Sequence, residues 1–247
     1  MKAYLHFVLA GAALLSLVPS ALSQTAKRPA KTAPVAPQRV ADSNLEAVLT
    51  QMDRAAATFR YAQADFVWDQ YQMVVEETDT QKGVIYFRRK GKDTDMAADV
   101  KKPESKYVLF ADGKLRLYQP RIDQVTEYDV AKKRAEVESF LVLGFGGRGH
   151  DLLRAFKVKL LNRETIDGVN TAVLELTPTA ANVHNMFSRM VLWIDPVRGI
   201  SLKQQFFEPS GDYRLARYLN INLNQKVPDE VFKLKTTPST KTVSPQA

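Results

Sequence analysis

The sequence of 247 residues contains no cysteine, and this absence excludes several kinds of chemistry at once. Without cysteine there can be no disulfide, no cysteine-ligated zinc and no thiol nucleophile. An N-terminal cysteine that carries a lipid anchor is excluded as well, so the chain is not itself a lipoprotein. Histidine is scarce, and His150 and His184 stand far apart in the sequence without the spacing of a metal site.

Acidic residues are absent from residues 1–41, which nevertheless hold five basic residues. A sixth basic residue, Lys241, stands in the polar C-terminal segment. Because the formal net charge of the whole chain is +8, residues 42–236 carry only +2. A protein that binds nucleic acid needs a basic face on the folded domain itself, so we predict no nucleic-acid partner.

No group of residues has the spacing of a catalytic site. The serines lack the setting of a nucleophile elbow, and the carboxylates are spread along predicted strand surfaces. Gly144-Phe145-Gly146-Gly147-Arg148-Gly149 matches GxGxxG, but a dinucleotide site also requires a parallel βαβ unit. We interpret this segment as a flexible glycine loop at the mouth of a cavity. The sequence therefore predicts no enzymatic activity, no cofactor and no bound metal.

Residues 1–23 have the pattern of a cleavable secretory signal peptide. Lys2 supplies the positive start, an apolar run extends over 7–18, and Pro19 ends it. Ala21-Leu22-Ser23 then supplies the small residues of a cleavage site. The alternative is an uncleaved membrane anchor, although the run is short for a membrane-spanning helix. We therefore expect an exported protein in the periplasm of a Gram-negative type of envelope.

The remainder divides into a linker, one domain and a tail. Residues 24–41 are basic and rich in proline, and we predict a disordered linker there. Residues 42–236 form the domain, and the polar residues 237–247 are predicted to be a disordered tail. Apolar residues at helical spacing predict an amphipathic helix over 43–58. Further helices are predicted over 131–142 and 150–156.

Short segments rich in β-branched and aromatic residues dominate the predicted domain. They alternate with turn residues, as at Asp112-Gly113, Asp167-Gly168 and the segment from Asp195 to Gly199. This pattern predicts about 10–11 strands in one antiparallel sheet that curls towards a barrel. The helices would cover one face of the sheet, which places the chain in the α+β class.

Large apolar side chains recur at alternate strand positions. Since strand side chains alternate between faces, Ile85, Phe87 and Arg89 share one face, and an arginine ends this apolar row. The side chains that could line a ligand cavity are Phe66, Trp68, Ile85, Phe87, Leu115 and Leu117. From the residues alone, ordinary core packing and a ligand cavity both remain open.

Several motifs follow one another in the order found in one known family. Ala64-Asp65-Phe66-Val67-Trp68 is similar to the first-strand motif Ala-x-Phe-x-Gln, with Trp68 in the place of glutamine. Gly83-Val84-Ile85-Tyr86-Phe87-Arg88-Arg89 is similar to Gly-x-Leu-x-(apolar)-x-Arg-Pro, with Lys90 in the place of proline. The segment from Asp112-Gly113-Lys114 through Tyr118-Gln119-Pro120 to Gln124 is similar to the most recognisable part of that family. By these motifs the chain resembles the LolA-like family of periplasmic outer-membrane lipoprotein carriers, over roughly residues 43–235.

The resemblance implies a half-open antiparallel β-barrel whose helices form a lid over a hydrophobic cavity. In the family, the cavity holds the acyl chains of lipoproteins on the way from an inner-membrane lipoprotein-releasing transporter to an outer-membrane receptor. The residue similar to Arg89 holds the lid closed and yields when cargo enters. By this resemblance the protein is a soluble, monomeric periplasmic carrier, with Arg89 as the lid latch.

Two other functions remain open at this stage. The same scaffold could carry or sense another lipid or a glycolipid. Alternatively, the apolar face is a filled core, and the protein is an interaction module that carries no ligand.

Overall fold

A computed structural model describes residues 36–131, 140 and 143–245. The predicted signal peptide and most of the predicted linker lie outside the described residues, as does almost all of the helix predicted over 131–142. Within the described part of the chain, no helix has the length and apolar composition needed to cross a membrane.

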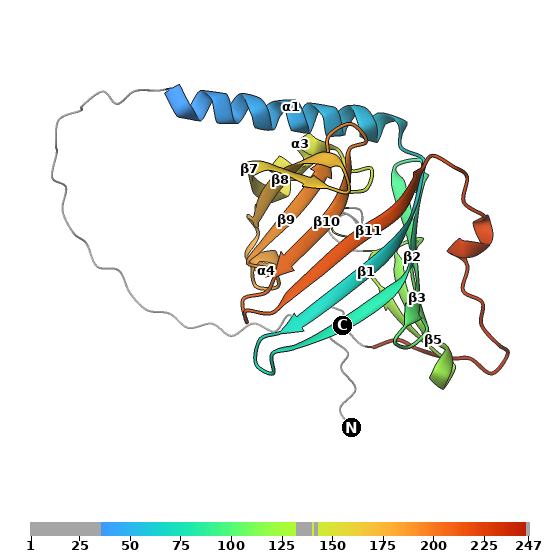
Figure 1. Ribbon diagram of the computed structural model, residues 1–247. Coiled ribbons are helices and arrows are strands. Elements are labelled where there is room, and N and C mark those ends of the chain that lie inside the picture. The colour runs from blue at the N-terminus through green and yellow to red at the C-terminus, as the bar shows by residue number, and fades with distance from the viewer. Residues whose placement is uncertain (1–35, 132–139, 141–142, 246–247) are drawn as a thin grey trace.

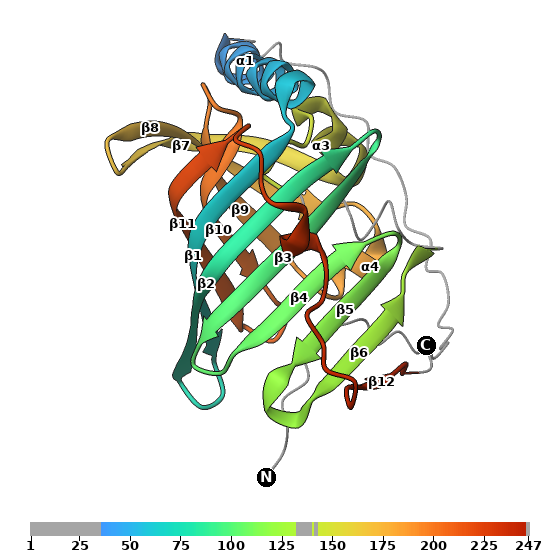
Figure 2. The same cartoon turned by 90° about the vertical axis from the view of Figure 1, so that its right-hand side faces the viewer.

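Twelve strands form one curled sheet in the described residues (Figures 1 and 2). Their order is β12-β6-β5-β4-β3-β2-β1-β11-β10-β9-β8-β7, so β7 and β12 are free edges and the barrel is half-open. Neighbouring strands are antiparallel except β12, which is parallel to β6. The strands are β1 Tyr61–Gln72, β2 Glu77–Lys90, β3 Asp93–Lys102, β4 Lys106–Ala111, β5 Lys114–Gln119, β6 Gln124–Asp129, β7 Phe156–Ile166, β8 Val169–Pro178, β9 Arg189–Asp195, β10 Ile200–Phe207, β11 Tyr213–Leu223 and β12 Lys241–Val243.

The predicted fold class is confirmed, and the predicted hairpin turns lie where the Asp-Gly pairs stand. Asp112 connects β4 to β5 with φ 54°, and Asp167 connects β7 to β8 with φ 47°. The glycine after each aspartate also has a positive φ, as two-residue hairpin turns require. The two turns are therefore equivalent in sequence and in backbone conformation.

The helices cover part of the concave face of the sheet. They are α1 Ala36–Thr58, α3 Gly149–Ala155 and α4 Ala181–His184, with short 3-10 turns η1 Pro120–Ile122 and η3 Asp229–Phe232. The helix predicted over 150–156 is confirmed by α3. By contrast, α1 begins at Ala36, so the end of the predicted linker is helical. A proline is well tolerated in the first turn of a helix, and Pro37 lies in the first turn of α1.

Helix α1 lies across the half of the sheet formed by β7–β10 (Figure 1). Its buried residues Val48, Leu49 and Met52 share a core with Leu174 of β8 and Leu192 of β9. These side chains recur at helical spacing on α1 and at alternate positions on the strands, so each element contributes one apolar face. The predicted role of this helix as a cover for the sheet is confirmed.

The C-terminal segment differs from the prediction of a disordered tail. It runs along the convex face of the sheet and adds β12 to the edge at β6 (Figure 2). Asp123, which has φ 44°, accepts hydrogen bonds from Thr237 Oγ1 (2.7 Å), Ser239 Oγ (2.7 Å) and Thr240 Oγ1 (2.6 Å). These hydrogen bonds, that of Thr240 above all, lower the pKa of Asp123 to about 2. Composition alone does not reveal this attachment, because it depends on one distant carboxylate.

The attachment of the tail should depend on the charge of Asp123. Because the pKa of Asp123 is depressed, its contribution is present above its ordinary pKa of about 3.9 and is lost as the pH falls towards about 2. We expect Asp123→Asn to reduce the protection of the β12 amides from hydrogen exchange at neutral pH. Asp129→Asn, at the other end of β6, is the control. Equal protection in both variants would show that Asp123 does not hold the tail.

The convex face is covered by the segment that precedes the tail. Val227 and Phe232 are buried against Ala97 and Leu109 of the sheet. Arg88 joins this segment to the sheet through ion pairs with Asp95 (2.7 Å) and Asp229 (2.6 Å), and its guanidinium lies 4.2 Å from the ring centre of Phe232. The side chains of Arg88 and Arg89 therefore point to opposite faces of β2.

Candidate functional site

The residues predicted to line a cavity lie on the concave face of the sheet. Phe66 of β1 and Ile85 and Phe87 of β2 are buried in one apolar cluster. Trp68 and Leu115 are partly buried against the same cluster, and the rings of Phe66 and Trp68 stack with centroids 4.2 Å apart. Leu117 is half-buried two pairs further along the β4–β5 hairpin, opposite Val108. The structure thus brings five of the six predicted residues together.

Arg89 points from β2 towards the segment that contains the glycines. Its Nη2 donates a hydrogen bond of 2.6 Å to the backbone oxygen of Gly146. Its guanidinium carbon lies 5.5 Å from the ring centre of Phe59, just after α1. Period-two alternation in β2 places Arg89 on the same side as Ile85 and Phe87, as predicted. Arg89 therefore connects the sheet to the segment that covers it.

We refer to residues 143–148 as the Phe145 loop. The side chain of Phe145 is only 1% exposed and belongs to the apolar cluster on the concave face. Its ring stacks on Phe87 with centroids 4.7 Å apart and planes inclined by 15°. It also meets the ring of Tyr218 edge-on, at 4.8 Å between centroids. One phenyl group of the loop therefore occupies space inside the barrel.

Polar contacts from β10 and β11 fix the backbone of the Phe145 loop. Gln204 Nε2 donates to the Leu143 oxygen (2.5 Å), and the Ser201 amide donates to the Gly144 oxygen (2.7 Å). Tyr218 in turn donates from its hydroxyl to Gln204 Oε1 (3.1 Å). Burial raises the pKa of Tyr218, so its phenol stays protonated and remains a donor. Three strands thus hold the loop. Strand β2 contacts it through Arg89, and β10 contacts it through Gln204 and Ser201. Strand β11 supports Gln204 through Tyr218.

Two glycines allow the loop to enter the barrel. Gly144 and Gly146 have φ values of 78° and 71°, a backbone conformation that other residues rarely adopt. A Cβ on Gly144 would lie 2.5 Å from Ser201, and one on Gly146 would lie 2.4 Å from the ring of Phe59. A side chain at either position would therefore displace the loop.

Phe145 lies inside the barrel and not at a cavity mouth, which is where the sequence interpretation placed residues 144–149. Its ring lies within the apolar interior, and hydrogen bonds from two strands hold the backbone on either side. The signal in the sequence is a single bulky residue among four glycines. The sequence alone does not show that this residue is buried, because its burial depends on the barrel interior that lies next to the loop.

A second set of contacts joins α1 to α3 outside the barrel. His150 Nδ1 lies 2.6 Å from Asp53 Oδ2, and His150 Nε2 lies 3.0 Å from Glu46 Oε1. Arg148 approaches the same Asp53 carboxylate at 3.7 Å. The hydrogen bond with Asp53 raises the pKa of His150. Burial alone would raise the pKa of Asp53, but its hydrogen bonds with His150 lower it overall.

The contact between α1 and α3 should weaken as the pH rises. The folded-state pKa of His150 lies above its ordinary value of about 6.5, so its contribution is complete below that pH and is lost as the pH passes the raised value. We expect the protection factors of the α1 amides, measured against the intrinsic exchange rate at each pH, to fall from pH 6 to pH 9, and His150→Gln to remove most of this fall. His184→Gln, at an exposed position of α4, is the control. An unchanged pH profile in His150→Gln would exclude His150 as the cause.

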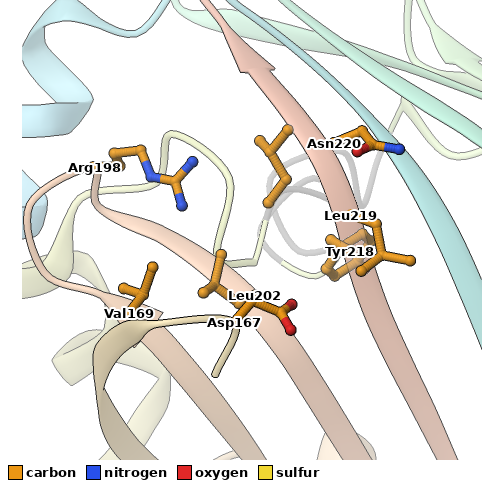
Figure 3. Close-up of a pocket in the computed structure, with 8 residues that line it drawn as sticks. Asp167, Val169, Arg198, Leu202, Tyr218, Leu219 and Asn220 are labelled. Carbon is orange, nitrogen blue, oxygen red and sulfur yellow. The ribbon is translucent and has the colours of Figure 1, made fainter. Parts of the chain in front are cut away.

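A pocket with a volume of about 320 Å³ lies where the β7–β8 hairpin approaches β11 (Figure 3). Leu202 and Tyr218, which also belong to the apolar cluster around Phe145, form part of its wall. Asp167 and Arg198 supply the charged groups at the pocket, and Asn220 of β11 lines another part of it. This pocket could not be predicted from the sequence, because it is formed by two turns and a strand that are distant in sequence.

The described residues contain no group of three or more histidine, aspartate or glutamate side chains placed to hold a metal ion. The polar side chains of Arg89, Gln204 and Tyr218 bind the loop or one another. These three side chains therefore join the loop to the sheet around an apolar interior.

Comparisons with known proteins agree with this architecture. The model of a family described as "uncharacterized protein" matches residues 80–237, and the chain belongs to this family. No curated protein matches the sequence. The half-open antiparallel barrel with covering helices is the fold that the motifs predict.

Two solved structures share the fold at low sequence identity, and a third is less similar. An uncharacterized conserved protein from Thermus thermophilus is 11% identical over 82% of this chain and 99% of its own, with a TM-score of 0.52. MucB is 14% identical over 78% of this chain and 63% of its own, with a TM-score of 0.51. A LolA superfamily protein from Nitrosomonas europaea is 15% identical over 77% of this chain and 97% of its own, with a TM-score of 0.38.

Proposed function

We propose that this protein is a periplasmic carrier, without enzymatic activity, that holds lipoprotein acyl chains in its half-open barrel. It would take them from an inner-membrane lipoprotein-releasing transporter and deliver them to an outer-membrane receptor. Residues 1–23 would direct export and then be removed, and residues 24–35 would tether the domain. The observation that carries the proposal is Phe145, an apolar side chain buried in the barrel on a loop that a few hydrogen bonds hold in place.

The energies involved favour exchange of the Phe145 side chain for an acyl chain. Exposing a buried phenylalanine costs about 2–3 kcal/mol. Loss of a hydrogen bond that involves a charged group costs a further 1.5–3 kcal/mol, approximately. Each methylene buried in return contributes about 0.8 kcal/mol, so about seven methylenes offset both costs. A long acyl chain can therefore open the loop, and its departure lets the loop close again.

The walls of the barrel suit such an exchange. The predicted residues Phe66, Trp68, Ile85, Phe87 and Leu115 belong to or pack against the same apolar cluster as Phe145, and Leu117 continues the apolar surface towards β6. Met96 lies in the same cluster and can adapt its side chain to a flexible ligand. We propose that these residues contact the acyl chain and that Arg89 acts as the latch. The protein would work as a monomer, because one chain supplies the whole surface.

The proposal is tested with full-length protein that has been expressed in a Gram-negative host and purified from the periplasm without detergent. We expect lipid mass spectrometry to find acyl-containing molecules, or the empty protein to bind the apolar fluorescent probe N-phenyl-1-naphthylamine. Protein that contains no lipid and does not bind the probe would contradict every carrier function and favour an interaction module.

Depletion of the protein in its own organism tests whether the cargo is a lipoprotein or another lipid. We expect outer-membrane lipoproteins to accumulate in the inner membrane. Correct localisation of lipoproteins, together with copurified lipid, would instead identify a carrier or sensor of another lipid or a glycolipid. MucB shares the fold, and a structure of MucB from Pseudomonas aeruginosa with MucA shows that a protein of this shape can also bind a protein partner.

A further inference from the structure

We infer that the pocket beside the β7–β8 hairpin binds the polar end of an amphiphile whose head group is zwitterionic. The inference rests on the proposed function and adds a site for the head group of the cargo. The pocket lies between the tip of this hairpin, the turn between β9 and β10, and the end of β11 (Figure 3). Its charges, its size and its connection to the interior each support the assignment.

The charged groups of the pocket are of opposite sign and do not neutralise each other. Asp167 is exposed at the hairpin tip, and no cation of the described residues lies within ion-pair distance of its carboxylate. Arg198 donates from Nε to Asp195 Oδ2 (2.6 Å), and none of the described residues accepts a hydrogen bond from its Nη groups. A head group with an ammonium near Asp167 and a phosphate near Arg198 would satisfy both.

The size of the pocket suits a head group without its hydrocarbon chain. Its volume of about 320 Å³ is at the lower end of the range of small-molecule sites, which is about 300–1,000 Å³. An acyl chain attached to the head group must therefore extend beyond the pocket. The neighbouring residues determine the direction in which the acyl chain can leave the pocket.

The wall of the pocket leads towards Phe145. Leu202 and Tyr218 line the pocket and also belong to the apolar cluster of the concave face. The ring of Tyr218 contacts Phe145 directly, with centroids 4.8 Å apart. A chain that passes Leu202 and Tyr218 thus reaches the space that Phe145 occupies. The head group would remain between Asp167 and Arg198 while the chain replaces the phenyl ring.

The test compares amphiphiles that have the same twelve-carbon chain and differ in the head group. Dodecylphosphocholine is zwitterionic, dodecyl maltoside is neutral, dodecyl phosphate is anionic and dodecyltrimethylammonium is cationic. Each displaces N-phenyl-1-naphthylamine from the full-length protein below its micelle concentration. We expect dodecylphosphocholine to compete most strongly.

Asp167→Asn should weaken the competition by dodecylphosphocholine about threefold to fivefold, in keeping with a partly exposed charge contact. It should leave dodecyl maltoside unchanged. Asparagine tolerates the positive φ of this position, so the variant keeps the turn. Asp112→Asn is the matched control, since Asp112 stands before a glycine in the same kind of turn. Arg198→Lys keeps a cation beside Asp195 and should also weaken dodecylphosphocholine specifically.

The outcomes separate the inference from the proposed function. If the probe binds and all four amphiphiles displace it equally, or if Asp167→Asn and Asp112→Asn behave alike, the head-group site is refuted while the carrier function stands. The head-group site is also refuted if dodecyl phosphate or dodecyltrimethylammonium binds as tightly as dodecylphosphocholine. If the probe does not bind to the wild-type protein, the carrier function fails and the head-group site falls with it.

Discussion

Replacement of Phe145 by alanine is expected to lower the free energy of unfolding by about 3 kcal/mol and at the same time to increase the binding of an apolar probe. Truncation of a buried phenylalanine removes its transfer free energy and leaves a cavity, and such changes cost about 3–5 kcal/mol. Phe145 is 1% exposed and contacts Phe87 and Tyr218, so little of this loss can be relieved locally. Urea unfolding and titration with N-phenyl-1-naphthylamine measure the two effects.

Phe232→Ala is the matched control for Phe145→Ala. Phe232 is also buried, at 6% exposure, but it lies on the convex face beneath the C-terminal segment. We expect a similar loss of stability with no gain in probe binding. If Phe145→Ala loses stability but binds no more probe than Phe232→Ala, then Phe145 is ordinary core and does not occupy a ligand site.

The second large effect is expected for Arg89→Leu, which should open the Phe145 loop without preventing folding. The lost hydrogen bond between Arg89 and the Gly146 oxygen (2.6 Å) involves a charged donor. Such a bond contributes about 1.5–3 kcal/mol, which corresponds to a shift of roughly tenfold to a hundredfold in the ratio of closed to open loop. We expect tighter retention of an acyl probe and slower transfer of that probe to acceptor vesicles.

Arg116→Leu provides the control for removal of an arginine. Arg116 is half-buried on β5, between Leu115 and Leu117, so it points to the other face and pairs with Glu127 at 2.7 Å. Its loss should leave the transfer rate unchanged. If Arg89→Leu transfers the probe at the wild-type rate, Arg89 is not the latch, whatever its effect on stability.

Local patterns in the sequence predict the part of the site that depends on one strand at a time. Ile85, Phe87 and Arg89 share a face because strand side chains alternate, and the structure confirms that this face is concave. The Asp-Gly turns follow from the backbone conformation that those residues allow. Such features require no knowledge of the rest of the fold.

Features that join distant segments of the chain could not be predicted from local patterns. The role of Phe145 depends on Gln204 and Ser201, which lie more than fifty residues further along the chain. The order of the tail depends on Asp123, and the pocket requires the turns that carry Asp167 and Arg198 to lie near β11. In each case, the isolated segment reads as a polar or glycine-rich loop, and only a partner from elsewhere in the fold gives it a structure.

The most direct test of the central claim is to locate a bound acyl chain on one face of the sheet. A fatty acid with a photoreactive group in its chain is bound to the full-length protein, crosslinked by light and mapped by peptide mass spectrometry. We predict crosslinks to Phe66, Ile85, Phe87 or Phe145 on the concave face. Crosslinks confined to Tyr86 or Tyr107, which pack beneath the C-terminal segment on the convex face, would contradict the account.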